Sequence, residues 1–328
     1  MSEMGLNNIV NTVRNYPGLV RKRPIQEVFN LLSSTHSFGS QLPNYGDDAA
    51  VIPWGEGFLL LAADGIMPQL LMNEPYAAGK ASVMVTVNDI YSMGGRPIAL
   101  VNVLACGDEG QRREVVKGIQ KGCEKLQVPM VGGHLHPDAP DGAPALSVAI
   151  LGFARGLLRS HLSRPGDDLI LAVDLQGRKG CQSVMSWDAN SGKTSEELLY
   201  RLELLPLIAE RKLASAAKDI SNAGMLGTLA IMIENSGQGA TVTLEAIPKP
   251  PDISFPDWVL AFQSFSFIFS VPPANSRKVV SLFQERDLAA AKIGKVTATR
   301  QVILQRGSEQ EILFDFNRER ITGIQYQG

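Results

Sequence analysis

The feature of this chain that most limits its fold is the alternation, in both halves, of short apolar runs with segments of helical length. In the N-terminal half, residues 77–93 have helical length and stop at Gly94-Gly95, and a second amphipathic segment places Val115, Ile119 and Leu126 on one side. A shorter helix is expected from Pro24. Strands are expected at residues 49–53, 58–63, 97–105, 128–131 (ending at Gly132-Gly133) and 145–153. This alternation predicts an α/β fold.

The second half repeats the alternation after a basic, loop-like stretch at residues 154–168. Its expected helices cover residues 195–205, capped by Ser195, and 222–235, and its expected strands cover residues 169–173, 240–244, 265–271 and 302–304. A length of 328 residues suits two domains at roughly 150 residues each. We therefore predict an N-terminal domain at residues 1–155 and a C-terminal domain at residues 156–328.

Composition excludes several classes of function. The 31 basic residues nearly balance the 33 acidic ones, which argues against a general polyanion binder, so no nucleic acid partner is expected. Residues 1–15 are polar, and no apolar run reaches the roughly 20 residues that span a bilayer, so neither secretion nor membrane insertion is expected. The widely spaced Cys106, Cys123 and Cys181 fit neither a zinc site nor a disulfide framework. They are interpreted as reduced thiols that act as small apolar fillers, and reduced thiols favour a cytoplasmic protein.

Carboxylates and glycines gather at the ends of several expected elements, where separate parts of a chain can converge. Because Mg²⁺ prefers oxygen ligands and keeps phosphate as a partner, dispersed aspartates beside glycines suit a metal nucleotide. A Walker A lysine motif is absent from the sequence, so the phosphates would be handled differently. The segments are Gly46-Asp47-Asp48-Ala49-Ala50-Val51, Ala63-Asp64-Gly65, residues 88–95 and Gly132-Gly133-His134-Leu135-His136.

Two other interpretations stay open at this point. Taken singly, an Asp pair before a strand is often a turn or cap, and a Gly pair often only ends a helix. His134 and His136, with Asp138 and Asp141, offer an alternative metal site for a hydrolase, because alternate residues of a strand point the same way.

Taken in order, these segments resemble the superfamily of AIR synthase, thiamine-monophosphate kinase, selenophosphate synthetase and HypE. The resemblance rests on residues 46–51, then Asp64, then Asp89 within residues 88–97. Gly132-Gly133-His134 is most similar to the selenophosphate synthetase branch, as are residues 218–227 and 245–249. The resemblance implies a two-domain AIR synthase-like (PurM-like) α/β fold, in which the N-terminal domains of two subunits pair into a barrel-like sheet.

The resemblance also implies a function and a site. Members share an ATP-dependent phosphorylation of a small acceptor, so a homodimeric, Mg²⁺-dependent enzyme is expected, acting on an amide, phosphate or similar oxygen nucleophile. The alternative is a nucleotide-binding scaffold without activity. The metal would be held by Asp48, Asp89 and Asp219; ATP would be contacted by Arg21, Gly46, Asp47, Asp64, Asp89, Gly132, Gly133 and His134, the last two reached from the partner subunit. Residues for the chemical step are not predicted.

Three departures from the selenophosphate synthetase pattern limit the assignment. Residues 15–24 lack the reactive Cys and offer Arg21, Lys22 and Arg23, so selenide is not expected as the acceptor. This basic segment is expected to be a mobile arm that closes over ATP, or else an exposed surface. Val85 stands where the family has Asn, and Phe265 and Phe267 replace glycines, which is expected to reshape the acceptor pocket.

Overall fold

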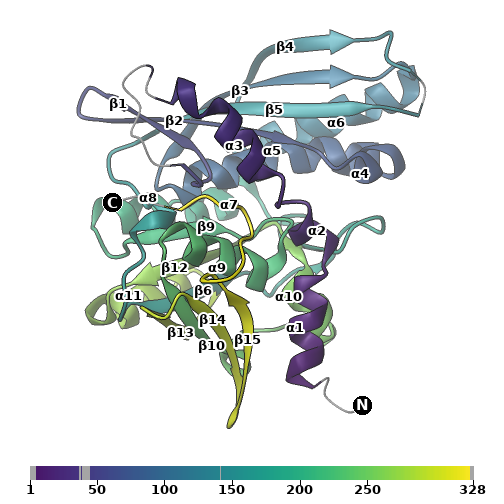
Figure 1. The fold of residues 1–328 in the computed structure, drawn as a ribbon. Coiled ribbons are helices and arrows are strands. Elements are labelled where there is room, and N and C mark those ends of the chain that lie inside the picture. The colour runs from purple at the N-terminus through teal and green to yellow at the C-terminus, as the bar shows by residue number, and fades with distance from the viewer. Residues whose placement is uncertain (1–4, 37, 39–44, 141, 326–328) are drawn as a thin grey trace.

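A computed structural model describes residues 5–36, 38, 45–140 and 142–325 of the chain. Figure 1 shows two α/β domains, with the N-terminal sheet and its helices above the C-terminal sheet and its helices. Among the described residues, no helix combines the length and the apolar character needed to cross a bilayer.

The N-terminal domain is built on a five-stranded sheet in the order β1-β2-β5-β3-β4. Its strands are β1 (Ala50–Trp54), β2 (Gly57–Gly65), β3 (Arg96–Ala105), β4 (Met130–His136) and β5 (Ala145–Ala154). The helices α4 (Pro68–Asn73), α5 (Pro75–Ser92) and α6 (Glu109–Leu126) lie below the sheet in Figure 1. Buried residues alternate along the strands, as in Leu146, Val148 and Ile150 of β5, so one face of the sheet forms the core with these helices.

The opposite face of this sheet is open in the part of the chain that the structure describes. Leu61, Val101 and Val103 lie on it, with 48%, 43% and 47% of their side chains exposed. An exposed apolar sheet face of this kind is a candidate interface.

Strand β4 differs from the sequence prediction, which ended it at Gly132-Gly133. The strand runs through both glycines to His136 because it pairs in parallel with β3, with Val101 opposite Gly132 and Val103 opposite His134. Pairing with a neighbouring strand therefore outweighs the local signal of two glycines.

The C-terminal domain contains a seven-stranded sheet in the order β15-β14-β10-β13-β6-β12-β9 and a small sheet in the order β11-β8-β7. Helix α9 lies buried along its whole length, and α7 begins with a capping box from Thr194, one residue before the predicted cap. The elements are β6 (Asp168–Val173), β7 (Arg178–Lys179), β8 (Ser186–Asp188), α7 (Ser195–Leu202), α8 (Leu204–Glu210), β9 (Ala216–Asp219), α9 (Gly224–Asn235), β10 (Gly239–Thr243), α10 (Phe255–Leu260), β11 (Phe262–Gln263), β12 (Ser266–Val271), α11 (Pro273–Gln284), β13 (Ala289–Thr297), β14 (Gln301–Arg306) and β15 (Glu309–Asp315).

The N-terminal segment is anchored to the C-terminal domain. Helix α1 (Leu6–Arg14) buries one apolar face in the core of that domain, and Leu19 of α2 (Pro17–Val20) is buried there too. Both terminal nitrogens of the Arg14 guanidinium donate to the Glu319 carboxylate, at 2.8 and 2.6 Å. The residues that lead up to Arg21 are therefore held by the C-terminal domain, and closure of the basic segment over ATP stays a prediction. The next helix, α3 (Ile25–Leu32), begins near the predicted position and has no buried residue.

Candidate active site in the cleft between the domains

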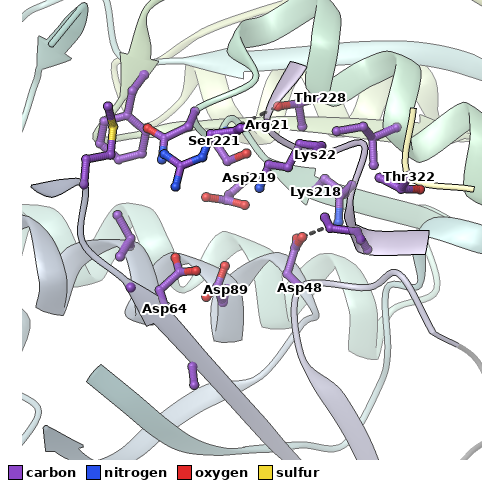
Figure 2. A pocket seen from close by; sticks show the side chains of 18 of the residues that line it. Arg21, Lys22, Asp48, Asp64, Asp89, Lys218, Asp219, Ser221, Thr228 and Thr322 are labelled. Carbon is purple, nitrogen blue, oxygen red and sulfur yellow. Dashed lines mark hydrogen bonds and ion pairs between the residues drawn. The ribbon is translucent and has the colours of Figure 1, made fainter. Parts of the chain in front are cut away.

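A cleft of about 600 Å³ lies between the two domains. Figure 2 shows Asp48, Asp64 and Asp89 on one side, and Arg21, Lys22, Asp219 and Ser221 on the other. The lining thus combines these four carboxylates, and that of Asp47 beside Asp48, with cationic side chains, which is the composition needed to hold a metal together with a polyanion.

Each carboxylate comes from a different element. Asp48 precedes β1, Asp64 lies near the end of β2, Asp89 belongs to α5, and Asp219 ends β9. The turn into Asp48 uses Gly46, whose φ of +94° favours glycine and whose Cβ, if present, would lie 2.7 Å from Asn235 Nδ2.

Three of these aspartates converge. Asp48, Asp89 and Asp219 each present a carboxylate oxygen within 4.8 Å of the others, and in the part of the chain that the structure describes they form the one cluster of His, Cys, Asp or Glu close enough to hold a metal ion. Burial raises the pKa of Asp89 and Asp219 well above the usual range, and repulsion from neighbouring carboxylates raises the pKa further. Three oxygen donors whose charges repel one another fit a hard cation such as Mg²⁺.

Asp64 lies beside this cluster and shares its electrostatics. Burial raises its pKa, Lys22 and Arg21 act in the opposite direction, and Asp48 adds to the increase. On balance the pKa of Asp64 is raised, because Lys22 and Arg21 only partly offset the burial and the charge of Asp48.

Lys218 is a site residue that the sequence did not identify by itself. Its buried ammonium donates to a carboxylate oxygen of Asp48 and, at 3.2 Å, to the carbonyl of Gly46. Burial alone would lower the pKa of Lys218, but Asp48 and the other acids raise it on balance, so the side chain stays cationic. The Ser92 hydroxyl donates to the second Asp48 oxygen at 2.7 Å, and Asp48 is therefore held from both sides.

Asp47 has different partners from Asp48. Its carboxylate accepts hydrogen bonds from Arg159 Nε at 2.7 Å and from the Ser160 amide and hydroxyl at 2.7 and 2.6 Å. The side chains of Arg159 and Asp47 are only 4% and 1% exposed. Asp47 lines the cleft, but these bonds already occupy its carboxylate, and a contact with ATP stays a prediction.

The basic segment supplies two side chains to the cleft. Arg21 and Lys22 line it, whereas Arg23 does not. Figure 2 shows both side chains across the cleft from Asp64 and Asp89, where they face the space that a polyanion would occupy.

Gly132, Gly133 and His134 lie outside the cleft, on the exposed edge strand β4. Gly133 and His134 line a separate groove next to Arg112 and Arg113 of α6. Within one chain these residues are therefore apart from the aspartates, and their predicted contact with ATP requires the partner subunit.

The alternative metal site gains a pair of residues, and the described part of the chain adds no third ligand to them. The rings of His134 and His136 lie on the same side of β4, with centroids 4.5 Å apart. The metal-sized cluster found among residues 5–36, 38, 45–140 and 142–325 does not include them. Asp141 lies outside the described residues.

Phe265 and Phe267 do not line the cleft directly, so their predicted effect on the acceptor pocket stays a prediction. Both rings are buried in the core, with their centroids 5.2 Å apart, and neither lines the cleft. Phe262, a few residues earlier, lines it instead, together with Val85.

The cysteines behave as the sequence suggests. Cys106 is buried, and burial raises the pKa of Cys123 and Cys181, which disfavours the reactive thiolate. None of the three is among the described residues that line the cleft.

Comparison with known proteins agrees with this architecture. Residues 46–154 match the family described as AIR synthase related protein, N-terminal domain, and residues 164–307 match the corresponding C-terminal domain. An uncharacterized protein of Synechocystis sp. is 36% identical over 97% of this chain and 98% of its own length. Phosphoribosylformylglycinamidine synthase subunit PurL of Methanosarcina mazei is 27% identical, over 77% of this chain but only 38% of its own length.

Solved structures share the fold at low identity. Thermotoga maritima PurL complexed with FGAR superposes with a TM-score of 0.72 at 17% identity, covering 92% of this chain and 52% of PurL. AaThiL complexed with AMPPCP and TMP gives a TM-score of 0.63 at 18% identity, covering 88% of this chain and 96% of AaThiL. With both domains matched in sequence and in fold, this chain belongs to the AIR synthase-related family and has its two-domain α/β fold.

Proposed function

We propose that this protein is a Mg²⁺-dependent enzyme that uses ATP to phosphorylate or activate a small-molecule acceptor in the cleft between its domains. The observation that carries the proposal is the convergence of Asp48, Asp89 and Asp219 in a cleft that Arg21 and Lys22 also line. Relatives support the use of ATP, since solved structures include Thermotoga maritima PurL complexed with ATP and AaThiL complexed with AMPPCP and TMP.

The side chains of the cleft have distinct tasks in this proposal. Asp48, Asp89 and Asp219 would hold Mg²⁺, which when bound neutralises charge on the triphosphate. Lys218 fixes the orientation of Asp48 through its ion pair. Arg21 and Lys22 donate to phosphate oxygens and stabilise the charge that is redistributed during transfer. The acceptor enters the same cleft, and its nucleophilic oxygen is positioned next to the terminal phosphate.

The experiment that tests the enzymatic proposal is ADP release from ATP in the presence of a metabolite extract. An enzyme releases ADP faster when the extract contains its acceptor, and a nucleotide-binding scaffold does not. Binding of ATP without any stimulation by acceptor-containing extracts would favour the scaffold.

Arg21→Ala is expected to weaken Mg²⁺-ATP binding by about tenfold or more, because a charge-assisted hydrogen bond contributes roughly 1.5 to 3 kcal/mol. Arg23→Ala is the matched control. It also removes one arginine charge, two residues further along the chain, but the Arg23 side chain does not line the cleft. Calorimetric titration measures both affinities. Equal loss in the two variants would indicate a general charge effect, and no loss in either would make the basic segment a surface feature.

We further propose that two copies pair through the open face of the N-terminal sheet. The exposed apolar side chains of Leu61, Val101 and Val103 support such an interface. Pairing would also bring the partner's β4 edge toward the cleft, which gives Gly132, Gly133 and His134 a place at the nucleotide.

Val103→Glu is therefore expected to convert a dimer into a monomer at about 10 µM, because a buried unpaired carboxylate costs several kcal/mol. Ile312→Glu is the control, since Ile312 has similar exposure but lies on β15 of the other domain. Light scattering distinguishes the two states. A wild-type protein that is monomeric at this concentration would remove the shared site from the proposal.

A further inference from the structure

A second, smaller cavity of about 210 Å³ adjoins the cleft. Leu70, Ala81, Val184 and Phe262 line both spaces, so these four residues form the border between them. The cavity is therefore an extension of the cleft.

Both domains build this cavity. Tyr76, Ala77, Lys80 and Met84 of α5 form one wall, and the small sheet with its connecting loop forms the other. One Glu74 oxygen accepts hydrogen bonds from the Ser183 amide at 2.8 Å and the Gln182 amide at 2.9 Å, which fixes the loop against the start of α5.

The lining favours a flat apolar group. Met84, Trp187 and Phe262 supply apolar surface, and the indole N–H of Trp187 is already used in a 2.9 Å hydrogen bond to the Asp174 carbonyl, which leaves its ring to pack. An apolar cavity of about 150 Å³ binds benzene, so the larger volume here suits a substituted or fused ring.

One end of the cavity is polar. The Lys80 ammonium lies 3.8 Å from an Asp188 carboxylate oxygen and donates to the Ser191 hydroxyl. Both charged side chains are about a quarter exposed, so a polar substituent of the ring can exchange hydrogen bonds with them in place of water.

Helix α5 connects this cavity to the metal cluster. Ala81, Val85 and Asp89 are spaced by four residues and so lie along one side of the helix. Two turns separate Ala81 from Asp89, about 12 Å at about 1.5 Å per residue. A molecule with its ring in the cavity can thus extend past Val85 to place a nucleophile at the aspartates.

We infer that this cavity binds the acceptor, and that the acceptor is a small molecule carrying an aromatic or heteroaromatic ring joined by a short linker to its nucleophilic oxygen. The inference rests on the proposed function. The competing occupant is the purine of ATP, which would displace a bound ring from the same cavity.

The test uses 5-fluoroindole as a probe, followed by ¹⁹F NMR with and without saturating Mg²⁺-AMPPCP. Ala77→Phe fills the cavity without reaching the cleft, because Ala77 lines only the smaller space, and Ala77→Ser is the size-matched control. The inference predicts that the wild-type protein binds the probe with the nucleotide present, that Ala77→Phe weakens binding at least about tenfold, and that Ala77→Ser changes it less than about twofold. Ser191→Trp fills the polar end and serves as a second variant should Ala77→Phe not fold.

Several results would overturn the inference. They are the absence of probe binding by the wild-type protein, equal binding by the filled variants, or displacement of the probe by Mg²⁺-AMPPCP, which would assign the cavity to the purine. The proposed function is tested by a separate titration, and it fails if the wild-type protein does not bind Mg²⁺-ATP. If both proposals hold, 5-fluoroindole also slows the ADP release stimulated by a metabolite extract and leaves ATP affinity unchanged.

Discussion

Asp89→Asn is expected to weaken Mg²⁺-dependent ATP binding by about 100-fold or more and, in the absence of metal, to stabilise the folded protein. Asp89 provides one of the three converging carboxylates. An amide at this position is a weaker ligand for Mg²⁺, because it lacks the negative charge of the carboxylate. The same substitution relieves the repulsion that Asp48, Asp64 and Asp219 exert on the buried Asp89 carboxylate. Single stabilising substitutions commonly raise the free energy of unfolding by about 0.5 to 2 kcal/mol, and an increase of this order is expected here.

Two measurements check this prediction, namely calorimetric titration of ATP with Mg²⁺ and thermal unfolding in a chelator. Asp252→Asn is the control, since it removes an exposed carboxylate that does not line the cleft, and it should change neither quantity. An Asp89→Asn protein that keeps wild-type affinity would remove Asp89 from the metal site. A lower melting temperature without metal would show that the cluster contributes to folding and is not under electrostatic strain.

Asp47→Asn is expected to destabilise the protein by about 3 to 5 kcal/mol, because it leaves Arg159 as a buried charge without its carboxylate. At a temperature where the variant is still folded, its affinity for Mg²⁺-ATP should stay within about threefold of wild type. Such a result would assign Asp47 a role in stability and leave Asp48 as the neighbouring carboxylate that holds the metal. Urea unfolding measures the first effect, and calorimetry the second.

The matched comparison is Glu109→Gln, which breaks the exposed pair between Arg113 and Glu109. Exposed pairs typically contribute about 1 kcal/mol or less, so this variant should unfold almost as the wild type does. If Asp47→Asn keeps its stability but loses ATP affinity, then Asp47 contacts the nucleotide as the family resemblance implied.

Much of the N-terminal domain could be predicted from the sequence, because its strands and helices carry strong local patterns. The helix expected at residues 77–93 is α5 (Pro75–Ser92), and the strand expected at residues 97–105 is β3 (Arg96–Ala105). The ordered motifs brought Asp48, Asp89 and Asp219 together as a hypothesis, and the structure places the three carboxylates within one cluster.

Other features depend on residues far away in the chain. Helix α1 was missed because its sequence is rich in Asn, and its Ile9 and Val13 become buried only against the distant C-terminal domain. The different roles of Asp47 and Asp48 are equally invisible locally, since Arg159 and Lys218, more than a hundred residues away, engage one carboxylate each. Tertiary contacts of this kind override local propensity.

The central claim, that Mg²⁺ held by the aspartates is required for ATP to bind in the cleft, is tested most directly by calorimetric titration of the wild-type protein with ATP. One titration contains Mg²⁺ and the other contains EDTA. We expect saturable binding with Mg²⁺ and at least about 100-fold weaker binding with EDTA, because without the cation the carboxylates repel the triphosphate. Equal affinity in the two titrations, or no binding in either, would contradict the account.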